Sequence, residues 1–278
     1  MFAKLLKHEW KATRGLLGIF SLAALIAGGV GALVLRFIVA YGDKMANAAA
    51  DDVGVRIESA AVGGLGMLLV FVMLALVAYY LGTQIVLLAR FYKNKFTDEG
   101  YLTFTLPVKT HQILGATWLN MLIWTVISAA VVMICAAMMV FTAISGIQLP
   151  GADIWTEAIT YWGDAFDFNA GYAVLTVVSA LVEWMLAPLI AMTCITIGAV
   201  AAKKHKILVA IAVYYGYSMI NGVISTVITS VVSIASFQAG VETMLGMSMA
   251  CGLLLQLLVA VVCWLLTNYL INNKLNLP

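Results

Sequence analysis

Apolar runs long enough to cross a bilayer recur along this chain of 278 residues. A transmembrane helix needs about 20 consecutive, mostly apolar residues. Six runs qualify, at about residues 15–40, 61–89, 113–144, 172–201, 207–236 and 245–271. Soluble domains do not carry such runs, and 64% of the residues here are hydrophobic. The sequence therefore predicts an all-α polytopic membrane protein, with six spans in a single transmembrane domain over residues 1–278.

Residues 1–14 precede the first run and form an amphipathic pattern at helical spacing. The apolar side of the helical wheel carries Phe2, Leu5, Leu6 and Trp10, and the basic side carries Lys4, Lys7, Lys11 and Arg14. This pattern predicts a helix in the membrane interface, with its basic side toward anionic lipid headgroups. The alternative is a basic flank that only orients the first span. No small-residue cleavage site follows the first run, so we expect this span to be retained.

Basic residues are distributed unevenly between the two ends of the predicted spans. One side collects Lys4, Lys7, Lys11, Arg14, Arg90, Lys93, Lys95, Lys109, Lys203, Lys204, Lys206 and Lys274. The other side holds Lys44 and Arg56, with Arg36 near the end of a span. Because basic residues concentrate in cytoplasmic loops, we expect both termini and the loop at residues 90–112 to be cytoplasmic. The predicted location is a cell membrane of the bacterial plasma-membrane type.

Motifs for catalysis, nucleotide binding and metal binding are absent from the sequence. It contains no G-x-x-x-x-G-K-S/T phosphate loop, no H-E-x-x-H and no G-x-S-x-G. The four cysteines lie inside apolar runs and the three histidines are scattered, which is not a metal-ligand pattern. The sequence predicts no catalytic residue, no metal site and no cofactor bound by this chain, so we do not expect an enzyme. It also predicts no nucleic-acid partner.

The fifth run carries a stripe of polar residues at spacings of four, three, four and four. The stripe consists of Tyr214, Ser218, Asn221, Ser225 and Thr229. On a helix these residues fall within about 80° of one another. Hydroxyl and amide groups in hydrocarbon require a partner or water. The stripe therefore lines a translocation path or the seam between two subunits, or it packs inside one subunit.

Glu183 is the only carboxylate inside a predicted span. Such a group is costly in a membrane, so it is a candidate for function. It would contact a cationic substrate, bond to the fifth span, or remain as a protonated structural acid. Pro188 is expected to kink the same helix and to free a carbonyl. Gln84, Asn120 and Gln256 are interpreted as interhelical hydrogen-bonding groups rather than as sites.

Residues 90–112 form a polar island between the second and third spans. A short helix is expected to start at Thr97, and Thr110 is expected to cap the third span. The island also carries apolar side chains that need a surface to cover them: Phe91, Tyr92, Phe96, Tyr101, Leu102, Phe104 and Leu106. This composition favours docking of the island into a soluble partner.

The loop sequence FTDEGYLTFTLPV stands ahead of a span that opens ILGATWLN. With the N-terminal amphipathic segment and the six spans, it resembles the permease subunit of a type-2 ABC exporter. The resemblance implies a cytoplasmic coupling helix that docks on a separate ATPase through Phe96, Asp98, Glu99, Tyr101, Leu102, Phe104, Leu106 and Pro107. It also implies two ATPase copies, which bind ATP and Mg, and a second permease chain in a homodimer or a homologous heterodimer.

Two departures from the family pattern limit what carries over. Thr117 stands where the family often has a lysine, and the loop at residues 238–243 is short for the re-entrant helices that the family often has there. An acidic, aromatic segment at residues 146–171 favours an amphipathic peptide, such as an antimicrobial peptide, as the substrate, although lipids and drugs fit the same features. Two alternatives stay open: an ATP-independent transporter or channel, and a membrane immunity protein that binds a peptide at the outer face.

Overall fold

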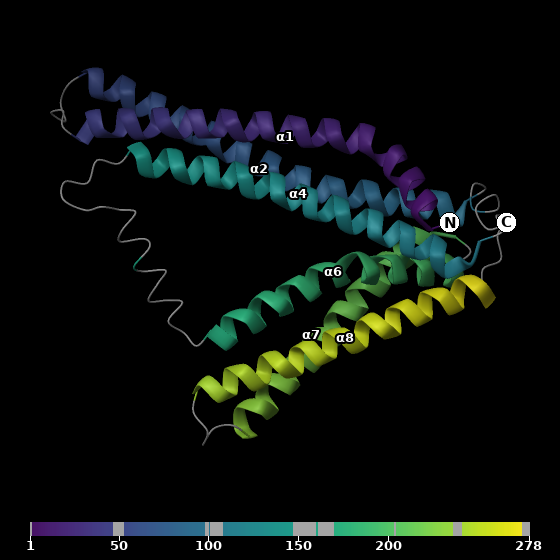
Figure 1. Cartoon of the computed structure of the whole chain (residues 1–278). Helices are drawn as coiled ribbons and strands as arrows, with labels where there is room; N and C mark the ends of the chain where they lie inside the picture. The colour runs from purple at the N-terminus through teal and green to yellow at the C-terminus, as the bar shows by residue number, and fades with distance from the viewer. Residues whose placement is uncertain are drawn as a thin grey trace. The chain divides into compact units, whose positions relative to one another are not determined.

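The computed structural model describes residues 2–46, 53–97, 100, 108–146, 160, 170–202, 204–235 and 241–273. The elements are α1 (Phe2–Ala46), α2 (Val53–Phe96), α4 (Thr110–Gly146), α6 (Ala170–Ala201), α7 (Lys206–Ala235) and α8 (Val241–Asn273), shown in Figure 1. Each of these six helices is long and apolar enough to cross a membrane. The prediction of an all-α protein with six candidate spans is therefore confirmed.

Most of the helices extend beyond the apolar runs that predicted them. α2 continues through Arg90–Phe96, which the sequence analysis assigned to the loop, and Lys93 and Lys95 lie in its last turn. Basic side chains in this position interact favourably with the C-terminal end of the helix dipole. With 45 residues, α1 is about 68 Å long at 1.5 Å per residue. That is more than twice the thickness of about 30 Å of a hydrocarbon core.

The predicted interfacial helix is not a separate element, because residues 2–14 are the first turns of α1. Lys4, Lys7, Lys11 and Arg14 are exposed along one side of these turns. Whether this side lies against lipid headgroups stays a prediction.

The chain divides into two compact units, and we describe each by itself. One unit comprises Met1–Leu6, Leu88–Leu122 and Ile159–Pro278. The other comprises Lys7–Leu87 and Ile123–Ala158. We call them the C-terminal unit and the N-terminal unit.

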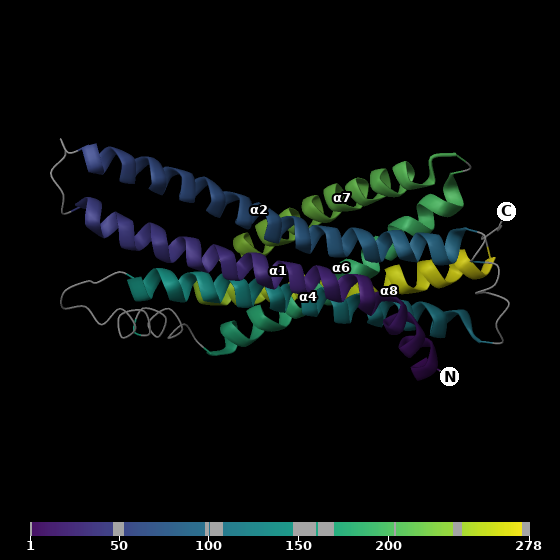
Figure 2. The same cartoon turned by 90° about the horizontal axis from the view of Figure 1, so that it is seen from above.

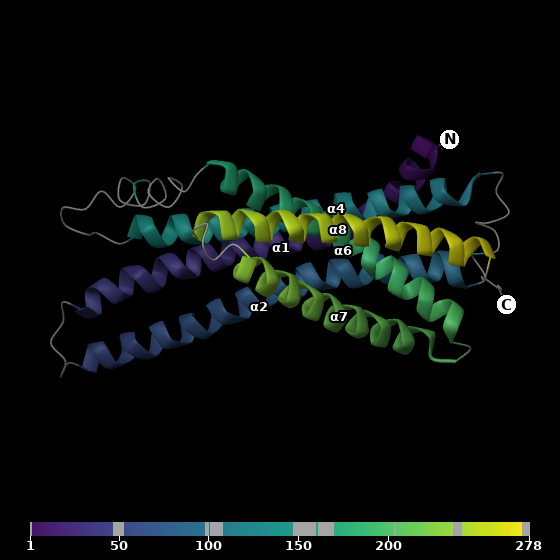
Figure 3. The same ribbon diagram turned by 90° about the horizontal axis from the view of Figure 1, so that it is seen from below.

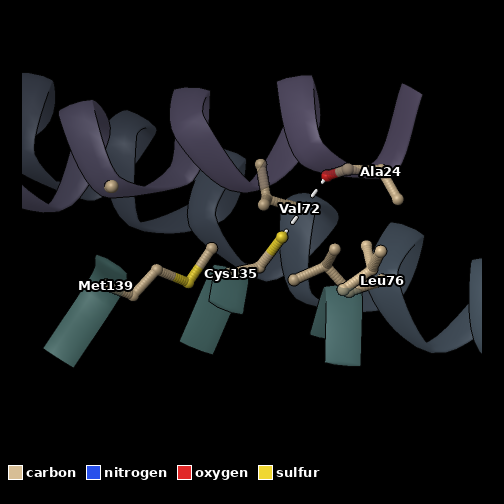
Figure 4. Packing of buried hydrophobic residues seen from close by; sticks show 7 residues of the cluster. Ala24, Val72, Leu76, Cys135 and Met139 are labelled. Atoms are coloured by element: carbon tan, nitrogen blue, oxygen red, sulfur yellow. Dashed lines mark hydrogen bonds between the residues drawn. The ribbon is translucent and has the colours of Figure 1, made fainter. Parts of the chain in front are cut away.

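In the N-terminal unit, segments of α1, α2 and α4 lie side by side (Figures 1 and 2). Their buried core contains Ala24, Ala32, Val72, Leu76, Val131, Cys135 and Met139 (Figure 4). Small residues allow α1 to approach its neighbours closely. At Gly28, an added Cβ would lie 2.7 Å from the Cβ of Cys135. The Cys135 thiol reaches the carbonyl oxygen of Ala24 at 3.6 Å.

A tryptophan pair joins α1 to α4 in the same unit. The rings of Trp10 and Trp124 are stacked, with their centroids 4.9 Å apart. The Nε1–H of Trp124 donates to Oγ1 of Thr13 at 2.9 Å, and Thr13 is buried. Trp10, which the sequence analysis placed on the apolar side of an interfacial helix, is therefore a packing residue between two helices.

Polar bonds also join the other two helix pairs of this unit. Oγ1 of Thr125 on α4 donates to Oε1 of Gln84 on α2 at 3.2 Å. The hydroxyls of Ser21 on α1 and Tyr79 on α2 are 2.8 Å apart. The interpretation of Gln84 as an interhelical hydrogen-bonding group is confirmed. Such bonds are worth about 0.6–2 kcal/mol each in a membrane.

The C-terminal unit is built on α6, α7 and α8, which pack on one another (Figure 3). Its buried cluster consists of Leu186, Leu189, Ile190, Cys194 and Cys263, and the side chains packed against it include Trp118, Tyr217 and Trp264. The hydroxyls of Thr193 on α6 and Thr267 on α8 are 2.9 Å apart. Both residues are buried, so this contact holds α6 and α8 together by a polar bond inside an apolar core.

α6 ends at Ala201 and α7 begins at Lys206, so a short connection joins them. His205, just before α7, has a left-handed φ of 58°, and its carbonyl accepts from the N–H of Val209 in the first turn of α7. The two helices then approach closely, because an added Cβ at Gly198 would lie 2.7 Å from the backbone nitrogen of Ala210. Glycine is therefore required at this crossing.

The start of α4 differs from the prediction. The carbonyl of Lys109 accepts from the N–H groups of Gln112 and Ile113, so Lys109 occupies the capping position. Thr110 is the first helical residue, and its hydroxyl donates to Oδ1 of Asn272 on α8 at 2.7 Å. The predicted cap at Thr110 is wrong, because this side chain bonds to a distant helix instead of its own helix end.

Candidate functional site

The predicted coupling segment begins where α2 ends. Of its eight residues, Phe96 is described, whereas Asp98, Glu99, Tyr101, Leu102, Phe104, Leu106 and Pro107 lie outside the described residues. Immediately after the helix, Oγ1 of Thr97 donates to the carbonyl of Lys93 at 2.5 Å. The N–H of Gly100 donates to the carbonyl of Thr97 at 2.7 Å.

Part of the apolar surface assigned to a soluble partner is covered by the chain itself. Phe91 is 1% exposed and Phe96 is 3% exposed. Their rings meet edge to face at 5.6 Å, and Tyr92 stacks on Phe96 at 6.1 Å. The described chain itself therefore covers Phe91 and Phe96, and the coupling role expected for Phe96 stays a prediction.

The predicted polar stripe lies along α7, and the described chain leaves most of it uncovered. Tyr214, Ser218, Ser225 and Thr229 are exposed, and Asn221 is half-buried. The buried residues of this helix are Ala210 and Val232. Val232 stands 18 residues, or five full turns, after Tyr214, so the stripe borders the packed side of the helix. The assignment of the stripe to a translocation path or a subunit seam stays a prediction.

A second row of hydroxyls, which the sequence analysis did not identify, widens the polar face of α7. Thr226, Ser230 and Ser233 each donate to the carbonyl four residues earlier, at 2.8, 2.8 and 2.7 Å, and Thr229 does the same at 2.9 Å. These bonds use the hydroxyl hydrogens and leave the oxygen lone pairs free to accept. The face can therefore accept hydrogen bonds from a ligand more readily than it can donate them.

Glu183 lies where the packing of α6 changes. Residues from Leu186 to Ala199 include most of the buried positions of this helix, whereas Val174, Val177, Leu181 and Met185 are exposed. Toward Ala170 the helix moves away from α7 (Figures 1 and 3) but keeps a contact with α8, where the hydroxyl of Thr176 reaches the sulfur of Met249 at 3.6 Å. Glu183 itself is exposed, and no hydrogen bond or ion pair joins it to another described residue.

Pro188 lies in the interior of α6, one turn from Glu183. A proline has no N–H to donate to the carbonyl four residues earlier, which here is that of Trp184. The Nε1–H of Trp118 donates to the carbonyl of Met185, the next residue, at 3.3 Å. A side chain of α4 thus supplies a donor beside the interrupted hydrogen-bond row, which is how neighbouring helices compensate for a proline in a membrane.

Tyr217 brings the acid and the stripe into one neighbourhood. It is half-buried, it packs against the cluster that contains Leu186, and it lies within electrostatic range of Glu183 and Tyr214. The sequence analysis did not select it, although it stands three residues after Tyr214. Its place on a row beside the stripe was the available signal.

The remaining polar candidates are structural or unpaired. Asn120 is buried at 2% exposure. The buried amide oxygen of Gln256 has no hydrogen-bond donor within the described chain, so the expected interhelical bond is not found for this atom. Among the described residues, no group of three His, Cys, Asp or Glu side chains is arranged to hold a metal ion.

Comparisons with protein-family models, with curated proteins and with solved structures gave no match. The class of protein therefore follows from the helices. Six helices of this length and composition define a polytopic, multi-pass membrane protein.

Proposed function

We propose that this chain is the permease subunit of an ATP-driven exporter of the type-2 ABC class, which moves an amphipathic substrate together with a separate ATPase. The observation that carries the proposal is the uncovered polar face of α7. A helix apolar enough to cross a membrane presents Ser218, Ser225 and Thr229 on its exposed surface. A protein that serves only as an anchor has no need of such a face, whereas a translocation path is lined by one.

The ends of α2 and α4 support coupling to a motor. Phe91 and Phe96 are buried side chains in the last turns of α2. The hydrogen bond between Thr110 and Asn272 joins the first turn of α4 to α8. A force applied to the connection between Phe96 and Thr110 therefore acts directly on the ends of two candidate spans. Coupling requires such a contiguous contact with an element that has two arrangements. ATP and Mg would be bound by the ATPase, in two copies, with a second permease chain completing the path.

The test is co-purification of ATP hydrolysis with the tagged chain from its native membrane. We expect Tyr101→Asp and Phe104→Asp to remove the co-purifying ATPase activity, because a carboxylate would replace an apolar docking side chain. Lys204→Asp is the control, since it places a carboxylate in the exposed turn between α6 and α7. The coupling assignment is refuted if all three variants keep the ATPase.

One observation favours a second candidate, an ATP-independent transporter. Glu183 is an exposed carboxylate in a candidate span, and ion-coupled transporters place acids in such positions. The same purification separates the two functions. ATPase activity bound to the unmodified chain supports the exporter, whereas its absence, combined with substrate flux into vesicles without ATP, supports the second candidate.

A further inference from the structure

We propose that Glu183 and the adjacent part of α7 form a recognition site for a cationic group, the ammonium or guanidinium of an amphipathic cargo. The inference rests on the proposed translocation role and names the chemical class of the substrate. It starts from the position of Glu183 in the middle third of α6, where it is exposed and has no hydrogen bond or ion pair with another described residue.

A charged side chain at the centre of a membrane helix costs about 3 kcal/mol on insertion scales, and more in simulations. A nearby cation offsets this cost. In the six described spans, every Lys, Arg and His residue lies outside the middle third of its helix. A second copy of this chain has the same distribution, so it supplies no cation at this depth. A cationic group on the cargo would supply a positive charge at this depth.

The groups around Glu183 also match a cation. Tyr217 packs against the cluster that contains Leu186, and it lies within electrostatic range of Glu183 and of Tyr214. Aromatic faces attract cations, and the effect strengthens when water is excluded. Trp184, the next residue of α6, is 38% exposed and adds a third ring to this region of the helix.

The hydroxyls of α7 stand nine or more residues beyond Tyr217 and lie outside the Glu183 site, but they favour the same sign of charge. Thr226, Thr229 and Ser230 have committed their hydrogens to carbonyls of their own helix. What they present outward is acceptor oxygen, which suits the N–H groups of an ammonium or guanidinium. An anionic headgroup would need donors instead. The carboxylate, the rings and the acceptor oxygens therefore select for the same sign of charge.

The test uses two probes of nearly equal size and opposite charge, tetraphenylphosphonium and tetraphenylborate. Binding of each to the full chain in nanodiscs is measured by equilibrium dialysis, with empty nanodiscs subtracted. We expect Glu183→Gln to weaken phosphonium binding about tenfold and to leave borate binding unchanged. Glu183→Asp keeps the charge and should retain most of the affinity. Glu9→Gln removes the same charge from the first turns of α1 and serves as the control.

Each outcome decides the assignment. Unchanged phosphonium binding in Glu183→Gln, equal losses in Glu183→Gln and Glu9→Gln, or no phosphonium binding by the unmodified chain overturns it. Loss of a dimer in Glu183→Gln, seen by size-exclusion chromatography, assigns the acid to a subunit seam and overturns it as well. The binding measurement contains no ATPase, so it can fail while the co-purification experiment succeeds, and the reverse also holds.

Discussion

Replacing Gly28 with alanine tests how closely α1 approaches α4. The added Cβ would lie 2.7 Å from the Cβ of Cys135, 3.4 Å from its Cα and closer still to its sulfur. Cys135 is fully buried, so its side chain has no open space to enter. The two helices must then separate, or the thiol must leave its contact with the carbonyl of Ala24.

Two opposing contributions determine how much Gly28→Ala changes the free energy of unfolding. Alanine is favoured over glycine in a helix interior by about 1 kcal/mol. Overpacking a filled core costs about 1–3 kcal/mol. Because one contact is with a Cβ on a helix backbone, we expect the upper part of that range, and a net loss of about 1–2 kcal/mol for Gly28→Ala.

Gly29 provides a matched control on the same helix. No atom lies within 4 Å of a Cβ added at Gly29, so Gly29→Ala receives the helix-propensity gain without the clash. Thermal unfolding in detergent is followed by intrinsic tryptophan fluorescence, for which Trp10 and Trp124 report on the same unit. We expect Gly28→Ala to lower the midpoint by several degrees and Gly29→Ala to leave it unchanged or raise it.

A second substitution identifies the contact responsible. Cys135→Ala removes the sulfur, which is the atom nearest to the added methyl group. In the Gly28→Ala background we expect it to restore part of the lost stability, because the Cβ contact remains. Equal midpoints for the Gly28 and Gly29 variants would refute the close approach.

Two further contacts, one in each unit, are probed by the same thermal assay. Trp124→Phe keeps a stacking ring but removes the donor to Thr13, and we expect a loss of about 1 kcal/mol. Adding Thr13→Val to that variant should cost little more, and fully additive losses would argue against the hydrogen bond. Gly198→Ala would place a Cβ 2.7 Å from the backbone nitrogen of Ala210, which cannot yield as a side chain can. It should therefore destabilise more than Gly28→Ala does, and a wild-type midpoint would contradict the crossing geometry.

The number and order of the candidate spans could be predicted from the sequence, but their ends could not. Hydropathy detects side chains that prefer lipid, whereas helical hydrogen bonds continue through polar residues as well. Arg90–Phe96 therefore belongs to α2, although its charges indicated a loop. Phe91 and Phe96 lie in this extension and are buried within the described chain, which the charge pattern did not indicate.

The candidate site, like the spans, could be predicted from the sequence only in part. The spacing of Tyr214, Ser218 and Thr229 correctly indicated one face of α7, because helical periodicity is local. The neighbours of a face are set by distant parts of the chain. Spacing along the sequence carries no information about the bond between Thr110 and Asn272, which are 162 positions apart. The proximity of Tyr217 to Glu183 has the same origin.

The short connection between Ala201 and Lys206 has a consequence for how the chain enters the bilayer. Because so few residues link α6, with 32 residues, to α7, with 30, we expect the two helices to insert as one helical hairpin. The insertion free energy is then summed over both helices. Each Leu, Ile, Val or Phe at depth contributes about −0.3 to −0.6 kcal/mol, so the apolar residues of the pair offset one acid at Glu183. Because basic residues are costly to translocate, we expect Lys204 and Lys206 to keep the connection between the two helices on one side of the bilayer.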